Sequence, residues 1–74
     1  MTYELTNEEK LGVITSHMKN VQLNKYNAEL SLLQEHAVFS PKEQNIQTLN
    51  DTIAQADAQL AALQQEYDLV AGAE

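Results

Sequence analysis

Apolar residues recur at alternating steps of three and four along the second half of the chain. Between residues 46 and 70 the series is Ile46, Leu49, Ile53, Ala56, Leu60, Leu63, Tyr67 and Val70. This spacing is the a/d seam of a coiled coil, in which apolar residues repeat every 3.5 residues on average. The pattern predicts a long helix with one narrow apolar stripe, and that stripe needs a surface to pack against.

The first half of the chain carries two apolar stripes instead of one. On a helical wheel, the first stripe contains Leu11, Ile14, Met18, Val21, Ala28 and Leu32. The second stripe lies about 120° away and contains Leu23, Tyr26, Leu30, Leu33 and Ala37. We expect the first stripe to form a seam with the helix at 46–70.

Two helix-start signals divide the chain. Thr6 and Glu9 match a capping box, in which each side chain bonds the backbone N–H of the other residue. Ser40-Pro41-Lys42-Glu43 repeats this pattern, with Pro41 at the first helical position. These signals predict helices over about 7–37 and 41–71, a turn at 38–40, and Gly72 as the residue that ends the second helix.

The short link between two long helices predicts an all-α fold, an antiparallel αα-hairpin that makes residues 1–74 a single domain. Residues 1–5 are expected to form an extended N-terminal arm. One continuous helix is the alternative, and Ser40-Pro41 disfavours it because proline interrupts the helical hydrogen bonds. Gly12 lies near the start of the first helix, and its presence indicates either tolerance of fraying or a close backbone contact.

A two-helix hairpin has only one inside, so the second stripe has two interpretations. In the first, the helices roll and both stripes share one widened core. In the second, which we favour, the stripe at Leu23, Tyr26, Leu30, Leu33 and Ala37 is an interface with other subunits or with a larger protein. Phe39 at the hairpin tip is expected to cover the end of the core, with an exposed anchor for a partner as the alternative.

Composition excludes several classes of partner and chemistry. The net charge of -7 argues against binding to nucleic acid phosphates or to an anionic membrane. The chain has no cysteine, its only histidines are His17 and His36, and no catalytic or phosphate-binding motif is present. We therefore expect no enzyme activity, no cofactor and no metal site. Lys25 occupies a seam position, from which we expect it to reach an acid such as Asp57.

The run LTNEEKLGVITSHMKNVQLNKYNAELSLLQEHAV, followed by a Ser-Pro turn and an Ala/Gln-rich helix, resembles small uncharacterised helical proteins of tailed phages, especially those of marine and cyanobacterial hosts. The resemblance implies a phage origin and a place in the virion or the host cytoplasm. With no signal peptide and no membrane span in the sequence, neither secretion nor membrane insertion is expected.

Together these features favour a structural or assembly protein that binds itself or a capsid or tail protein, as a homo-oligomer or as part of a larger assembly. The alternatives are a small acidic regulator that inhibits a host enzyme and a self-associating helical bundle.

Overall fold

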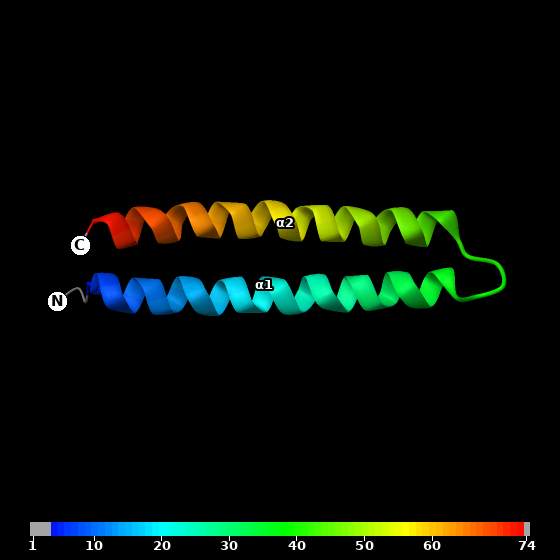
Figure 1. Cartoon of the computed structure of the whole chain (residues 1–74), viewed down its shortest axis with the longest axis horizontal. Helices are drawn as coiled ribbons and strands as arrows, with labels where there is room; N and C mark the ends of the chain where they lie inside the picture. Colours follow the sequence, from blue (N-terminus) through cyan, green and yellow to red (C-terminus); the bar gives the residue numbers. More distant parts are fainter. Residues whose placement is uncertain (1–3, 74) are drawn as a thin grey trace.

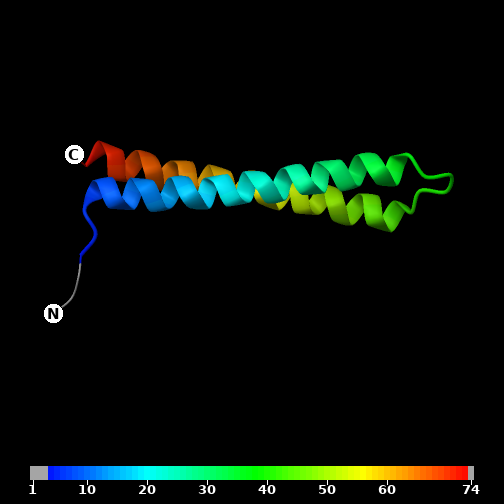
Figure 2. The ribbon, with the colours of Figure 1, turned by 90° about the horizontal axis from the view of Figure 1, so that it is seen from below.

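The computed structural model describes residues 4–73 and shows an all-α antiparallel hairpin, as the sequence predicts. Helix α1 spans Asn7–His36 and helix α2 spans Glu43–Gly72, each 30 residues long. The two helices lie side by side, so the start of α1 and the end of α2 share one end of the molecule (Figure 1). The result is a rod of 58 × 20 × 18 Å, in which the helices cross at a shallow angle (Figure 2).

Helix α1 begins with the predicted capping box. The Thr6 hydroxyl oxygen accepts a hydrogen bond from the backbone N–H of Glu9 at 3.1 Å. In return, the Glu9 carboxylate accepts from the backbone N–H of Thr6 at 3.0 Å. Both interactions satisfy backbone groups that a helix start leaves without partners, so the cap fixes where α1 begins.

Helix α2 begins two residues later than predicted, and the predicted cap at Ser40 is wrong. Its N-cap residue is Lys42, whose side chain makes no capping bond. The backbone N–H of Lys42 donates instead to Oε1 of Glu35 on α1, at 2.8 Å. The Glu35 carboxylate therefore supplies a hydrogen-bond acceptor for a backbone N–H at the start of α2, where the helix dipole favours negative charge.

The helix ends also differ from the prediction. Helix α1 stops at His36, one residue early, and α2 continues through Gly72. No glycine among residues 4–73 has a positive φ, so Gly72 does not end α2 by adopting a left-handed conformation. Each helix closes instead on a right-handed cap residue, Ala37 or Ala73, whose N–H bonds a carbonyl of the last turn.

The covered residues of both helices follow the predicted seam. On α1 the partly or fully buried residues are Asn7, Leu11, Ile14, Met18, Val21, Lys25, Ala28, Leu32 and Glu35. On α2 they are Ile46, Leu49, Ile53, Ala56, Leu60, Leu63, Tyr67 and Val70. Both series advance by three and four, and they contain every residue predicted for the seam. The most deeply buried are Ala28 and Ala56, 6% and 5% exposed.

Two further expectations concern Gly12 and the N-terminal arm. A Cβ placed on Gly12 would meet no atom within 4 Å, so no close contact within the chain requires glycine there. Of the predicted arm at residues 1–5, residues 1–3 lie outside the described part of the chain, and Leu5 precedes α1 with an exposed side chain. No helix within residues 4–73 is long and apolar enough to cross a membrane.

Candidate interaction surface on helix α1

The second apolar stripe of α1 lies on the surface of the hairpin. We name it the outer stripe and define it by Leu23, Tyr26, Leu30, Leu33 and Ala37. Leu23, Tyr26 and Leu33 are 54%, 58% and 66% exposed, and Leu30 and Ala37 are exposed as well. The interpretation in which the helices roll to bury both stripes is therefore wrong.

The outer stripe faces almost directly away from α2. Over this part of α1 the seam consists of Val21, Lys25, Ala28, Leu32 and Glu35. At about 100° per residue, the centres of the seam and the outer stripe are roughly 160° apart, more than the 120° predicted. The predicted angle was smaller because the predicted stripe also included Leu11, Ile14 and Met18, which lie further round the helix than the seam residues beside the outer stripe. A partner on the outer stripe would form a third layer beyond the hairpin.

The outer stripe has a rim that is mostly polar and uncharged. One side of the stripe carries the amides Asn20, Asn27 and Gln34. The other side carries Gln22, Glu29 and His36. All six residues are exposed. Protein interfaces typically combine an apolar centre with few charges and a polar rim. The composition of this surface fits that pattern.

Lys25 is turned toward α2, as its seam position predicts. Its ammonium nitrogen lies 2.7 Å from Oδ1 of Asp57. This hydrogen bond and the charge of Asp57 raise the pKa of Lys25 above its ordinary value of 10.5, and the charge of Glu29 adds to the effect. Because Lys25 points toward Asp57, its positive charge does not lie on the outer face of α1.

Phe39 lies at the tip, fully exposed at 108%, and does not cover the end of the core. The favoured expectation for this residue is wrong because α1 ends at His36, so Phe39 lies in the link beyond the last seam residues. It is therefore an exposed aromatic side chain, placed apart from the outer stripe.

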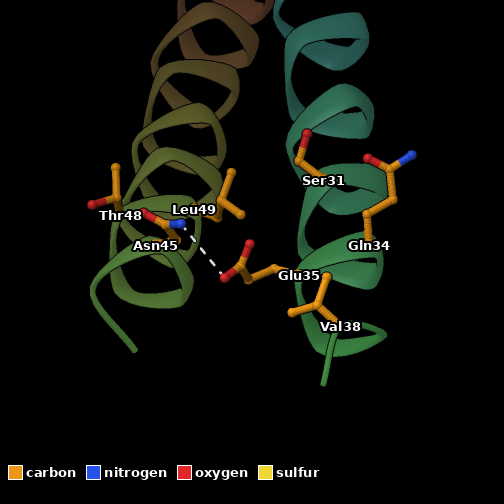
Figure 3. A pocket seen from close by; sticks show the side chains of 7 residues that line it. All are labelled: Ser31, Gln34, Glu35, Val38, Asn45, Thr48 and Leu49. Carbon is orange, nitrogen blue, oxygen red and sulfur yellow. Dashed lines mark hydrogen bonds between the residues drawn. The ribbon is translucent and has the colours of Figure 1, made fainter. Parts of the chain in front are cut away.

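An open groove of about 410 Å³ lies between the helices near the tip (Figure 3). Its lining residues come from both helices and the link: Ser31, Gln34, Glu35, Val38, Asn45, Thr48 and Leu49. The Glu35 carboxylate reaches across this groove, where its Oε1 also accepts from the Asn45 side-chain amide at 3.5 Å. Because Glu35 accepts hydrogen bonds from Lys42 and Asn45, we interpret the groove as a structural contact between α1 and the start of α2.

The outer face of α2 differs from that of α1 in shape and charge. It carries exposed alanines, Ala54, Ala58, Ala61 and Ala62, and a shallow hollow of about 590 Å³ is lined mainly by small and amide side chains. Helix α2 has five acids and no Lys or Arg, a net charge of -5, whereas α1 has four acids against three lysines, a net charge of -1. The acidic character of the protein is thus concentrated on one helix.

The described residues offer no arrangement for metal chemistry. Within residues 4–73, no three His, Cys, Asp or Glu side chains come together in a way that would hold an ion. His17 and His36 are both exposed and lie 19 positions apart on α1.

Comparison with known proteins gives no relative: no protein-family model matches the chain, no curated protein matches it, and no solved structure matches it. The function is therefore proposed below from the surface of the hairpin and from the sequence pattern.

Proposed function

We propose that the chain is a non-enzymatic structural or assembly protein that docks through the outer stripe of α1. The supporting observation is that Leu23, Tyr26, Leu30 and Leu33 are exposed along one face while α2 covers the opposite face. Covering the exposed part of each leucine by a partner contributes on the order of 1 kcal/mol. Several such residues in one row supply enough apolar surface for a specific contact.

The resemblance to tailed-phage proteins supports a phage virion as the assembly, with a capsid or tail protein as the larger partner. A helix with apolar anchors at steps of three and four is a common mode of recognition between proteins. In this role α2 packs on one face of α1, and the outer stripe on the other face remains available to the partner.

Replacing Leu23, Leu30 and Leu33 together by Gln tests this proposal. The variant is expected to remain helical by circular dichroism, because these side chains lie outside the seam, and to lose its association with purified particles. The matched control is Leu69→Gln, which removes an exposed leucine from α2. Unchanged particle association of a helical triple variant would exclude docking by the outer stripe.

A second candidate is a small acidic regulator that binds and inhibits a host enzyme. The concentration of five acids without a base on α2 favours it, since such a surface attracts basic proteins. This function predicts that the protein copurifies with a host enzyme and is absent from purified particles. Mass spectrometry of purified virions separates the two candidates.

A further inference from the structure

We propose that the hairpins also stack on one another in a row, with the outer stripe of α1 on one copy docked against the alanine face of α2 on the next. This inference rests on the proposed docking role of the outer stripe, and it names a second copy of the chain as a partner. The support comes from the position, shape and charge of the two faces.

The two faces occupy the same position relative to their seams. On α1, Tyr26 and Leu33 each follow a seam residue, and Leu23 and Leu30 each lie two residues before one. On α2, the exposed alanines repeat this relation: Ala54 and Ala61 follow seam residues, and Ala58 lies two before one. Figure 1 shows α1 and α2 side by side, and because each of these faces lies away from its seam, the two faces form opposite long edges of the hairpin.

The shapes of the two faces are complementary over the first three residues of the outer stripe. Copies in the same orientation bring α1 of one against α2 of the next in an antiparallel manner, as within the hairpin. One antiparallel alignment of the two helices places a large side chain opposite an alanine at three successive positions. The facing pairs are Leu23 with Ala61, Tyr26 with Ala58, and Leu30 with Ala54. Ala58 and Ala61 line the hollow of about 590 Å³, which gives the larger side chains room.

Charge favours the same register. Lys19 is exposed on α1 four residues before Leu23, and a helical lysine extends toward the start of its helix. In this register its ammonium group reaches the level of Asp68, an exposed acid at the edge of the hollow. Antiparallel contact between the outer stripes of two copies would instead bring Glu29 of one copy near Glu29 of the other. Contact between the α2 helices of two copies would place two helices of net charge -5 against each other, and they would repel.

A contact between two different faces leaves one face of each kind free at the ends of a pair. Such contacts therefore continue beyond a dimer, into a ring if the rotation closes and into an open row if it does not. The seam and the outer stripe are not diametrically opposite, so the row is expected to curve.

The test uses the purified full chain in sedimentation velocity over a range of concentrations. The wild-type protein is expected to form species larger than two copies as concentration rises. A variant of the α1 face, Leu23→Glu with Leu30→Glu, and a variant of the α2 face, Ala58→Glu, are each expected to be monomeric and helical. Glu retains high helix propensity and all three positions are exposed, so the fold is preserved.

Mixing the two variants in equal amounts distinguishes this arrangement, because each variant retains one intact face. The mixture is expected to form pairs and to stop there. Gln59→Glu, an exposed change on another side of α2, serves as the matched control and should stack like the wild type. Lys19→Glu should weaken stacking about fivefold, and adding Asp68→Lys should restore it.

Two outcomes overturn the inference: a wild-type protein that stays monomeric, or an Ala58→Glu variant that still forms dimers alone, which indicates contact between two α1 helices. The first outcome leaves docking to a larger partner intact if the Leu23, Leu30 and Leu33 variant still loses particle association. Failure of stacking is thereby distinguished from failure of the proposed function.

Discussion

The two faces of α1 carry apolar residues at the same helical spacing, but only one of them is covered. Ile14 and Ala28 on the seam are 9% and 6% exposed, whereas Tyr26 and Leu33 on the outer stripe are 58% and 66% exposed. The difference lies in α2, which supplies one apolar stripe and otherwise presents polar residues and alanine. Apolar periodicity therefore predicts which residues can be buried, and the number of packing partners decides which of them are.

The strongest test of this comparison deletes one side chain from each face. Ile14→Ala is expected to lower the free energy of unfolding by about 2–3 kcal/mol, because it removes buried methyl groups and leaves a cavity. Leu33→Ala on the outer stripe is expected to change it by less than about 0.5 kcal/mol. Urea unfolding followed by circular dichroism measures both, and equal losses would show that the outer stripe is packed within the monomer.

Glu35 extends the comparison to the tip, where a seam residue acts through its charge. Glu35→Ala is expected to lower the free energy of unfolding by about 1 kcal/mol, because the N–H of Lys42 loses its acceptor at the start of α2. Amide hydrogen exchange in the first turn of α2 should accelerate. Glu66→Ala, which removes an exposed acid from the last third of α2, is the control and should leave that exchange unchanged.

Gly12 tests whether the outward side of α1 tolerates added side chains. Gly12→Ala is expected to raise the free energy of unfolding by about 0.5–1 kcal/mol, since alanine is the better helix former and its Cβ meets no atom within 4 Å. The melting temperature measured at low protein concentration checks this. A lower melting temperature would reveal a close contact that requires glycine.

Lys25 gives the smallest expected effect, because it is a polar residue on the seam face. Its raised pKa means that the ion pair with Asp57 contributes its full stability below pH 10.5, and loses it as pH rises through the raised value. Lys25→Met should change stability only slightly at neutral pH, since the two side chains are 27% and 55% exposed and water screens their attraction. The stability of the wild type relative to Lys25→Met should fall above pH 10.5, and a constant difference in urea unfolding would contradict the pairing.

The architecture of the hairpin is largely determined by local patterns in the sequence. Steps of three and four assign Ile46 through Val70 to one stripe, and the capping box at Thr6 marks the start of α1 within one residue. Lys25 also follows from its position, because a lysine in a seam needs an acid within reach on the opposite helix. In each case the relevant partners are a few residues away or are related by the antiparallel pairing.

The features that the sequence does not predict depend on residues that are distant or on exact helix ends. The start of α2 depends on Glu35, seven residues earlier and on another helix, which no local capping pattern reveals. The exposure of Phe39 follows from the end of α1 at His36, and helix ends are the least certain part of a sequence-based prediction. The outer stripe itself is visible in the sequence, and only the structure shows that it stays uncovered.

The seam is narrow, and no side chain among residues 4–73 is completely removed from water. The heat capacity of unfolding arises mainly from apolar surface that becomes hydrated, and it is about 12–15 cal/mol/K per residue in globular domains. A hairpin that hides less of this surface has a smaller value, and its curve of stability against temperature is correspondingly flatter. The same rod is therefore expected to unfold gradually on heating and to resist cold denaturation.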